Sequence, residues 1–338
     1  MVSVENFNYY LPKKLIGQKP IRPRDHSRLM VLKRREQKIV HDYFYNLDKY
    51  LRPGDMLVAN NSKVIPARLL GKKETGGKIE ILLIKPLGSA KWEALVKGKS
   101  KSGLNIIFNK NFKGQLIQSV NSNSWQIKFN LIGEKLNQAI NKFGVAPTPP
   151  YIKPLSNLKE YQTIYAKHPG SIAAPTAGFH FTPRLIKKLK KQDMDLEFIT
   201  LHVGLGTFQP VKVREIQKHK MHSEIAEIKP RVAYKLNKIK TNKQRIIAIG
   251  TTSARTLEAF CLNKNKLEFG TKSIELFIYP PYQFKFIDGM ITNFHLPKST
   301  LLMLVCAFAN RDFIFQAYHE AIKNKYRFYS FGDAMLII

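Results

Sequence analysis

Between residues 55 and 129 the hydrophobic positions of the chain fall in short runs separated by polar breaks. The breaks carry glycine and serine, as at Gly76-Gly77, Gly88-Ser89 and Ser102-Gly103, and such residues are typical of turns between strands. The runs predict β-strands at residues 56–60, 64–70, 78–85, 92–96, 115–120 and 125–129. Strands at this spacing, with no helix between them, favour a small antiparallel barrel or sandwich.

The pattern changes after residue 133, where apolar positions begin to recur at helical spacing. A helix is expected at residues 134–143, and another opens at Thr182-Pro183, with proline at its first position. Strands and helices then alternate: strands at 196–203, 245–249 and 273–279, and helices at 231–240, 254–260 and after 297–300. Such alternation predicts an α/β fold. We therefore expect an α/β main domain formed by residues 1–70 and 147–338, with a small all-β, barrel-like domain inserted at residues 71–146.

The composition of the chain indicates the cellular compartment in which we expect the protein. The apolar fraction of 44% is that of a globular protein. The first residues lack a basic stretch followed by an apolar run, so no signal peptide is expected. The longest apolar run, residues 301–309, is too short to cross a bilayer. Two cysteines, Cys261 and Cys306, allow at most one bridge. We expect a cytoplasmic protein without a membrane partner, and a monomer as the default state.

Charge points to a class of partner. The chain has 56 basic and 24 acidic residues and a net charge of +32, which attracts polyanions and favours nucleic acid regardless of its base sequence. A plainer reading is that lysine is abundant with asparagine and isoleucine, as in AT-rich genomes, and that many lysines lie on solvated helix faces. Charge alone therefore suggests a polynucleotide partner but does not identify it.

Four segments combine glycine, hydroxyl residues and histidine in ways that core packing does not require, at residues 174–182, 201–210, 249–255 and 292–300. Three of them lie at expected helix starts, whose backbone N–H groups bind carboxylates or phosphates. Each also has a structural explanation: Gly204-x-Gly206 lacks a third glycine because Gln209 stands there, the Gly250 segment suits helix capping, and a single histidine is often structural.

The sequence gives little support to a metal site or to a nucleoside triphosphatase. On a helix, the three-residue spacing of His219 and His222 would place both on one face, where they could bind a metal. No cysteine cluster or Glu-flanked histidine pair accompanies them. The chain has no Gly-x4-Gly-Lys-Ser/Thr phosphate loop, which argues against a nucleoside triphosphatase. We expect no metal.

Taken in order with other motifs, the four segments resemble one family. The further motifs are Arg-Pro-Gly-Asp at 52–55, Asn-Asn-Ser-Lys-Val-Ile-Pro-Ala-Arg-Leu at 60–69, Glu-Thr-Gly-Gly at 74–77, Tyr-Gln-Thr-Ile-Tyr-Ala at 161–166 and Phe-Tyr-Ser-Phe-Gly-Asp-Ala-Met at 328–335. From near residue 4 to its end, the chain resembles the S-adenosylmethionine:tRNA ribosyltransferase-isomerase family. It departs from the family where Asn61 replaces the usual aspartate and around residues 157–160.

The resemblance implies a reaction of queuosine synthesis. The ribosyl part of S-adenosylmethionine is transferred to the aminomethyl group of 7-aminomethyl-7-deazaguanine at the tRNA wobble position and is isomerised. Epoxyqueuosine-tRNA forms, and adenine and methionine leave. The expected partners are S-adenosylmethionine and tRNA carrying that base. No cofactor is implied, because S-adenosylmethionine is a consumed substrate.

The chemistry needs a base for a weakly acidic carbon beside the sulfonium, a proton donor for departing adenine and an acceptor for the attacking amine. Histidine suits all three, so the candidate catalytic residues are His180, His202, His222 and His295, with His180 favoured. The start of the helix near Thr251 and Arg255 suits the methionine carboxylate, and Glu224 or Asp333 suits its ammonium. The matching segments supply the substrate-binding candidates Thr176, Gly178, Gly204, Gly206, Thr207, Glu224, Gly250, Thr251, Thr252, Arg255, Asn293, Ser299, Thr300 and Asp333, and the RNA-binding candidates Lys63, Arg68 and Lys298.

Two other hypotheses share the charge and the compartment. An S-adenosylmethionine-dependent RNA methyltransferase would use the same ligand, but its glycine-rich turn normally follows the first strand, whereas Gly204 and Gly206 lie far into the chain. A non-catalytic RNA-binding protein would bind tRNA without turnover. The released small molecule distinguishes the ribosyltransferase-isomerase from the methyltransferase, because transfer-isomerisation frees adenine and methylation frees S-adenosylhomocysteine.

Overall fold

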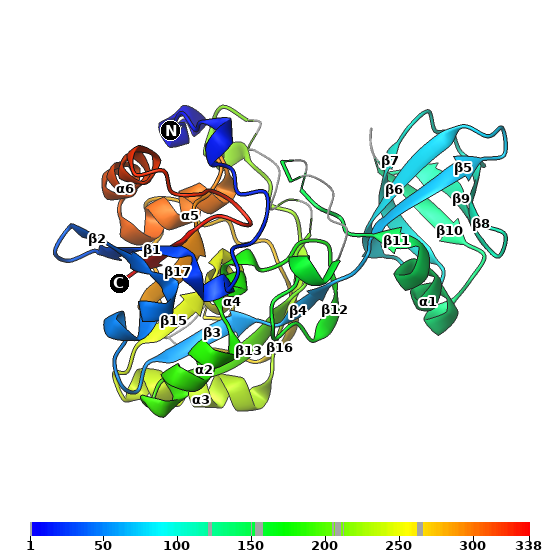
Figure 1. Ribbon diagram of the computed structural model, residues 1–338. Helices are drawn as coiled ribbons and strands as arrows, with labels where there is room; N and C mark the ends of the chain where they lie inside the picture. The colour runs from blue at the N-terminus through cyan, green and yellow to red at the C-terminus, as the bar shows by residue number, and fades with distance from the viewer. Residues whose placement is uncertain are drawn as a thin grey trace. The chain divides into compact units, whose positions relative to one another are not determined.

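A computed structural model describes residues 2–120, 124–149, 151–152, 158–204, 206, 211, 213–261 and 266–338. The chain forms two compact units (Figure 1). Unit 1 comprises Met1–Lys63, Gln162–His168 and Ala174–Ile338, and unit 2 comprises Val64–Tyr161 and Pro169–Ala173.

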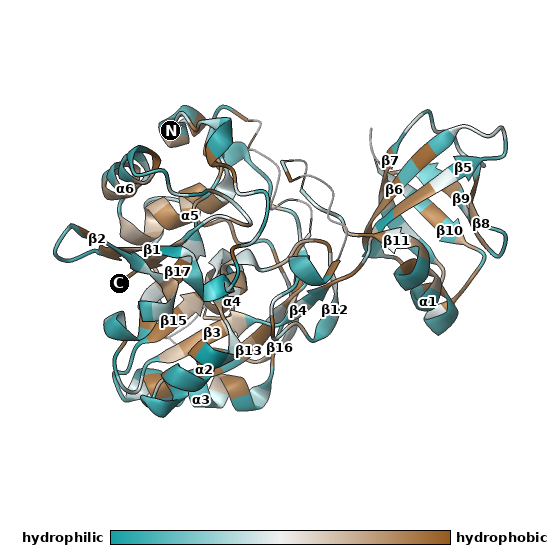
Figure 2. Ribbon diagram, in the orientation of Figure 1, coloured by the Kyte–Doolittle hydropathy of each residue, from teal (hydrophilic) through white to brown (hydrophobic). Residues whose placement is uncertain are grey.

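Unit 1 is built on a nine-stranded mixed sheet with the strand order β16-β14-β13-β3-β15-β17-β18-β1-β2. The strands are β1 (Arg28–Lys33), β2 (Lys38–Tyr43), β3 (Met56–Asn60), β13 (Asp195–Leu201), β14 (Glu224–Ile228), β15 (Ile246–Ile249), β16 (Gly270–Ile274), β17 (Gly289–Asn293) and β18 (Ala334–Ile337). The central strands are short and apolar (Figure 2). Every residue of β3, β15 and β17 is buried, as expected of parallel strands covered on both faces.

The helices of unit 1 are α2 (Pro183–Lys191), α3 (Pro230–Thr241), α4 (Thr251–Phe260), α5 (Thr300–Ala309) and α6 (Arg311–Lys323). Short 3-10 helices join them: η1 (Val4–Phe7), η2 (Lys13–Leu15), η3 (Arg24–His26), η4 (Phe44–Tyr50), η6 (Thr176–His180) and η8 (Ile216–Lys218). Among the described residues no single helix is long and apolar enough to span a membrane, and only α5 and α6 taken together, bent by 115°, match in length and composition.

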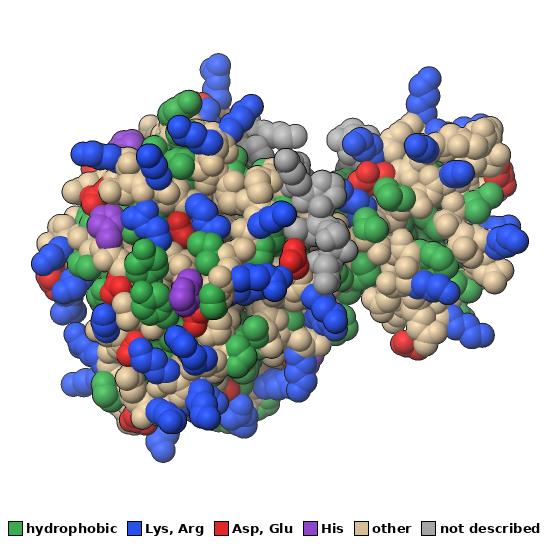
Figure 3. Space-filling model, viewed as in Figure 1, with side chains coloured by type: hydrophobic (Ala, Val, Ile, Leu, Met, Phe, Trp, Pro, Cys, Tyr) green, Lys and Arg blue, Asp and Glu red, His purple; other side chains and the backbone are tan. Residues whose placement is uncertain are grey.

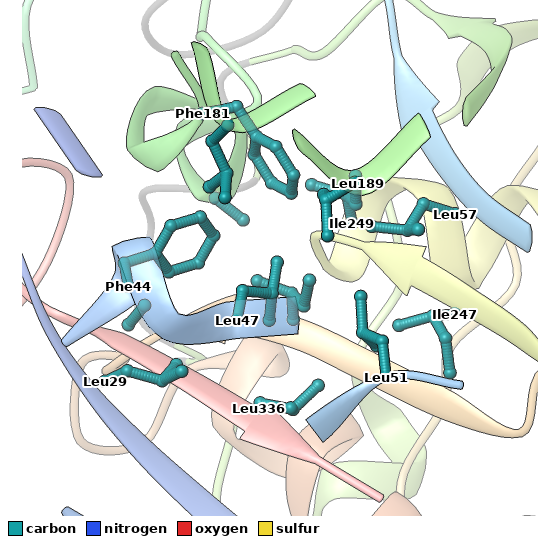
Figure 4. Close-up of a cluster of buried hydrophobic side chains, with 14 of the residues drawn as sticks. Leu29, Phe44, Leu47, Leu51, Leu57, Phe181, Leu189, Ile247, Ile249 and Leu336 are labelled. Carbon is teal, nitrogen blue, oxygen red and sulfur yellow. The ribbon is translucent and has the colours of Figure 1, made fainter. Parts of the chain in front are cut away.

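A cluster of buried hydrophobic side chains lies between one face of the sheet and the segments η4 and α2 (Figure 4). Alternate strand residues such as Leu57, Ile247 and Leu336 point toward Phe44 and Leu189, because side chains along a strand alternate between its faces. This packing fixes where the ends of the central strands lie, and the candidate residues are at those ends.

Strand direction brings distant segments to one edge of the sheet. β13, β3, β15 and β17 run parallel, so the residues that follow them, among them Asn61, His202 and Gly250, gather at the carboxyl ends of these strands. β18 is antiparallel to β17 and parallel to β1, so the residues that precede these two strands, Asp333 and Ser27, reach the same edge. We call it the carboxyl edge; ligands of α/β sheets typically bind at such an edge.

Unit 2 is an antiparallel barrel whose ring of six strands closes through pairing of β5 with β8. Its elements are β5 (Arg68–Lys73), β6 (Lys78–Pro86), β7 (Lys91–Lys97), β8 (Asn105–Asn109), β9 (Phe112–Ser119), β10 (Ser124–Phe129), α1 (Gly133–Phe143), β11 (Gly144–Val145) and η5 (Leu158–Tyr161). Phe112, Leu116 and Ile127 fill its interior. A separate two-stranded sheet pairs β4 (Ser62–Val64) with β12 (His168–Ser171).

The predicted fold class is confirmed: an α/β main body and a small barrel. Whether residues 71–146 fold as an independent domain stays a prediction. Two predicted strands were wrong in part. The strand at 64–70 is divided around Pro66, because proline has no N–H for the ladder. The strand at 273–279 ends at Ile274, since its partner β14 begins at Glu224, the residue paired with Ile274.

Candidate active site

His180 is held at the carboxyl edge by hydrogen bonds to both of its ring nitrogens. Nδ1 lies 2.7 Å from Oγ of Ser27, and Nε2 lies 3.1 Å from Nδ2 of Asn293. Oγ1 of Thr176 donates in turn to Oδ1 of Asn293 (3.1 Å). Because an amide nitrogen only donates, Nε2 of His180 accepts and the ring proton resides on Nδ1. The ring is 4% exposed.

The surroundings keep this ring neutral. Burial, followed by the positive charges of Arg327 and Arg24, lowers the pKa of His180 to about 3. Phe44 packs against the ring at 5.1 Å between centroids. A neutral imidazole with its lone pair on Nε2 is the form that a general base requires, although here Asn293 occupies that lone pair.

A second site lies at the start of α4, in a pocket that we call the Arg255 pocket. Its polar lining consists of His219, His222, Glu224, Thr251, Thr252, Arg255 and Thr300, and the remaining lining residues are Gly206, Met221, Leu276, Phe277, Ile278, Leu301 and Leu304. Gly250 precedes the helix with φ of +87°, a backbone conformation that suits glycine. The sequence-predicted residues Gly206, His222, Glu224, Thr251, Thr252, Arg255 and Thr300 therefore meet in one place.

Arg255 and Glu224 form a buried ion pair in this pocket. The two side chains are 8% and 5% exposed. Oε1 of Glu224 also accepts a hydrogen bond from the backbone N–H of Gly204 (2.7 Å). Burial lowers the pKa of Arg255 to about 10, so its guanidinium is still charged at neutral pH.

The pair leaves hydrogen-bonding capacity unused. Within the described part of the chain, Nη1 of Arg255 and Oγ1 of Thr252 are buried without a hydrogen-bond partner. A buried polar atom in that state is costly, and a ligand oxygen would satisfy both. A cation, an anion and a helix N-terminus together complement a group that carries both a carboxylate and an ammonium.

The remaining predicted histidines have different surroundings. His295 is buried, lies 2.8 Å from Oγ1 of Thr292 and has its pKa lowered by burial to about 3. His202 follows β13; burial and then His168 lower its pKa, and its Nδ1 has no hydrogen-bond partner among the described residues. Neither lines the Arg255 pocket. His222 does, and a Cβ on Gly206 would lie 2.5 Å from its ring.

Several predicted residues have contacts within the fold. A Cβ on Gly178 would overlap the Tyr165 hydroxyl, so the glycine allows the close approach of that side chain. Ser299 caps α5 by accepting from Leu302 N–H (3.2 Å). Asp333 accepts backbone hydrogen bonds from Arg28 (3.0 Å) and Arg327 (2.8 Å).

The predicted RNA-binding residues are dispersed. Lys63 is exposed. Arg68, in unit 2, pairs with Glu80 (3.4 Å) and donates to Thr148 O (3.1 Å). Lys298 pairs with Glu5 (2.7 Å). Thr207 lies outside the described residues.

Sequence reasoning considered His219 only as a metal ligand and missed the arginines near His180. His219 lines the Arg255 pocket, where its ring meets Phe277 edge-on at 5.3 Å. Arg24 and Arg327 line a pocket with His180. No local signal in the sequence marks these two arginines, which are separated by some 300 residues; only the strand order brings them together.

The similarity of the chain to known proteins covers its whole length. A sequence model of the family described as "Queuosine biosynthesis protein" matches residues 4–337. The chain is 50% identical over 338 residues to the S-adenosylmethionine:tRNA ribosyltransferase-isomerase of Thermosipho melanesiensis, covering 99% of this chain and all of that one. It is 49% identical to the enzyme of that name from Thermotoga maritima, covering both chains fully. A crystal structure of S-adenosylmethionine tRNA ribosyltransferase from Thermotoga maritima superposes with a TM-score of 0.58 at 39% identity, covering 98% of this chain and 100% of that one.

Proposed function

The chain belongs to the queuosine biosynthesis protein family, and on that premise we propose that it is an S-adenosylmethionine:tRNA ribosyltransferase-isomerase. It transfers the ribosyl part of S-adenosylmethionine to 7-aminomethyl-7-deazaguanine at the tRNA wobble position and isomerises it. The products are epoxyqueuosine-tRNA, adenine and methionine. Relatives at about half identity over the full chain share this enzyme name.

The observation that carries the assignment of a substrate site is the buried Arg255–Glu224 pair at the start of α4. In this proposal the methionine carboxylate binds Nη1 of Arg255 and Oγ1 of Thr252, which lack hydrogen-bond partners among the described residues. The ammonium binds the carboxylate of Glu224. The aromatic and aliphatic residues Phe277 and Ile278 of the same pocket would lie against less polar parts of the substrate.

His180 is the proposed proton carrier. It is neutral at working pH, because its pKa is lowered to about 3. In this state it is a weak base, so in our proposal a negative charge of the bound substrates raises this pKa before the proton is transferred. η6 also adjoins the Arg255 pocket, because the Cβ of Ala177 lies 3.5 Å from where a Cβ on Gly250 would stand, and Gly250 directly precedes Thr251. Movement of the Asn293 amide away from Nε2 would free the lone pair when substrate binds.

We propose that the reaction needs no cofactor, because S-adenosylmethionine supplies both the transferred ribosyl group and the leaving groups adenine and methionine, and the protein has only to bind the substrates and move protons. Turnover in the presence of a chelator tests this, and strict dependence on added zinc would contradict it.

We also propose that the protein acts as a monomer in the cytoplasm, where tRNA is modified. Sedimentation of the active protein tests the monomeric state.

The released small molecule tests the assigned reaction. Protein, S-adenosylmethionine and tRNA carrying the aminomethyl base are incubated, and the supernatant is separated by chromatography. Adenine and methionine are expected in equal amounts. S-adenosylhomocysteine in their place would mean methyl transfer, and tRNA binding without either product would mean a non-catalytic RNA-binding protein.

A further inference from the structure

An open hollow on the surface of unit 1 follows one face of α2, and we call it the α2 hollow. Its volume is about 590 Å³, and its lining is Ile164, Tyr165, Pro183, Ile186, Lys187, Lys190 and Lys191. The five lining residues that belong to α2 recur at i, i+3, i+4, i+7 and i+8, which is the spacing of a single helix face. The face of α2 that packs on the core is a different one and carries Leu185 and Leu189.

The rim of the α2 hollow carries positive charge that the protein does not neutralise. Five of the nine residues of α2 are basic and none is acidic. Lys188, outside the hollow, pairs with Asp48 at 2.6 Å. Lys187 and Lys191 are exposed and form no ion pair within the described part of the chain. These two lysines can therefore bind an anionic ligand without losing a partner in the protein.

The floor of the α2 hollow is apolar. Ile164 is 46% exposed there, Ile186 is half-buried, and the Tyr165 ring packs on Phe198 with 5.3 Å between centroids. A basic helix face that only faces water needs no such floor. An apolar surface beside cations complements an unpaired nucleotide, because its base has an apolar face and its phosphate is an anion.

The α2 hollow also adjoins the segment that carries His180. Thr182 caps α2 two residues after His180, and Pro183, the first residue of the helix, already lines the hollow. On the other wall, the Tyr165 hydroxyl lies against Gly178 of η6. A strand of RNA bound in the hollow would therefore continue toward His180.

We propose that the α2 hollow binds an unpaired nucleotide of the tRNA anticodon loop, next to the wobble nucleotide. Its base packs on Ile164 and Ile186, and the phosphates on its two sides bind Lys187 and Lys191. Paired nucleotides fit less well, because their bases are stacked in the helix and expose only their edges. Further Lys and Arg side chains cover the part of unit 1 where Figure 1 places α2 (Figure 3) and would attract the RNA. This inference rests on the proposed function and adds the surface that holds the RNA substrate.

The charge part of the test measures tRNA affinity against salt concentration by fluorescence anisotropy, without turnover, for Lys187→Gln, Lys191→Gln and the double variant. Loss of one phosphate contact on a single strand lowers the slope of log affinity against log salt by about 0.7. Because the two lysines bind different phosphates, the double variant is expected to lose about 1.4. Lys323→Gln is the matched control, since Lys323 is exposed and ends α6 as Lys191 ends α2. It is expected to leave the slope unchanged.

The apolar part of the test uses Ile164→Asn, with Ile164→Leu as its conservative control. Asparagine removes the apolar contact but no charge, so affinity for an anticodon stem-loop is expected to fall about fivefold with an unchanged salt slope. Leucine is expected to retain the affinity. A blunt RNA duplex with the sequence of the anticodon stem has no unpaired base, so Ile164→Asn is expected to bind it as the wild type does.

Melting temperatures are recorded for every variant, because a lysine in the last turn of a helix also stabilises that helix. Unchanged slopes in the folded lysine variants would overturn the proposal, as would an equal loss of slope in Lys323→Gln. Equal weakening of stem-loop and duplex by Ile164→Asn would overturn the assignment to an unpaired nucleotide. Since binding is measured without turnover, reduced slopes would support the α2 hollow even if the wild type made no product. That failure would count against the proposed reaction only.

Discussion

The amide of Asn293 donates its Nδ2 hydrogen to Nε2 of His180 at 3.1 Å, and this contact fixes the tautomer of the neutral imidazole. Nδ1 therefore carries the proton and lies 2.7 Å from Ser27 Oγ. The three residues come from the ends of β17, η6 and the chain before β1. A neutral, oriented histidine at the carboxyl edge is the basis of the first prediction.

Replacement of His180 by Gln is expected to lower turnover by about a hundredfold or more, the usual loss when a positioned proton carrier is removed. Glutamine can still hydrogen-bond with Ser27 and Asn293, whereas alanine would leave both unsatisfied at about 1–3 kcal/mol for each buried group. The melting temperature of His180→Gln should therefore change less than that of His180→Ala. Single-turnover product formation per folded protein is the measurement. Near-normal turnover in His180→Gln would remove His180 from the mechanism and turn attention to His295.

Stability should fall as pH is lowered from 7 toward 4. Burial lowers the pKa values of His180 and His295 to about 3 from 6.5. Between these limits the unfolded chain binds more protons than the folded one, so the free energy of unfolding rises with pH in that window and is lost as pH falls. The melting temperature of His295→Gln is expected to depend less steeply on pH than that of the wild type. The exposed His319→Gln serves as control, and an equally steep profile in His295→Gln would contradict the prediction.

The sequence predicted the fold class because its hydrophobic spacing changes after the barrel segment. It also predicted six of the seven polar residues that line the Arg255 pocket: those of α4 because the glycine and hydroxyl residues there mark a helix N-terminus, and the others through the family resemblance. It did not predict β1, β17 and β18, whose short apolar runs carry no pattern that separates a buried strand from a buried helix.

Sequence spacing also could not say which segments meet. His180 and Asn293 are 113 residues apart, and Arg24 lies near Arg327 only because β1 and β18 are neighbours. His295, like His180, lies in a polar segment just before a helix, but its ring is hydrogen-bonded to Thr292. Asn61, which departs from the family pattern, accepts a hydrogen bond from Thr200 (2.8 Å).

Removal of the Arg255 guanidinium should weaken substrate binding selectively. Arg255→Gln is expected to raise the KM for S-adenosylmethionine about ten- to hundredfold, as loss of a charged hydrogen bond does, with the KM for tRNA unchanged. It should also destabilise the protein by about 3–5 kcal/mol, since the buried carboxylate of Glu224 loses its partner. The double variant Arg255→Gln/Glu224→Gln should regain part of that stability without regaining affinity. Recovered affinity in the double variant would show that the pair is structural only.

Packing around η6 gives a separate prediction. A Cβ at position 178 would overlap the Tyr165 hydroxyl, so Gly178→Ala is expected to cost about 1–3 kcal/mol, as overpacking does. Tyr165→Phe removes the nearest atom, and that hydroxyl is buried without a hydrogen-bond partner in the described chain, so the double variant should recover part of the loss. Denaturant melts of the four proteins give the coupling energy. Simple additivity of the two substitutions would contradict the packing account.

The mass of the wobble nucleoside tests the central claim most directly. Purified protein is incubated with S-adenosylmethionine and tRNA carrying 7-aminomethyl-7-deazaguanine, and the tRNA is digested to nucleosides for mass spectrometry. The account predicts that the precursor is replaced by epoxyqueuosine only when S-adenosylmethionine is present. An unchanged precursor, or one heavier by a single methyl group, would contradict it.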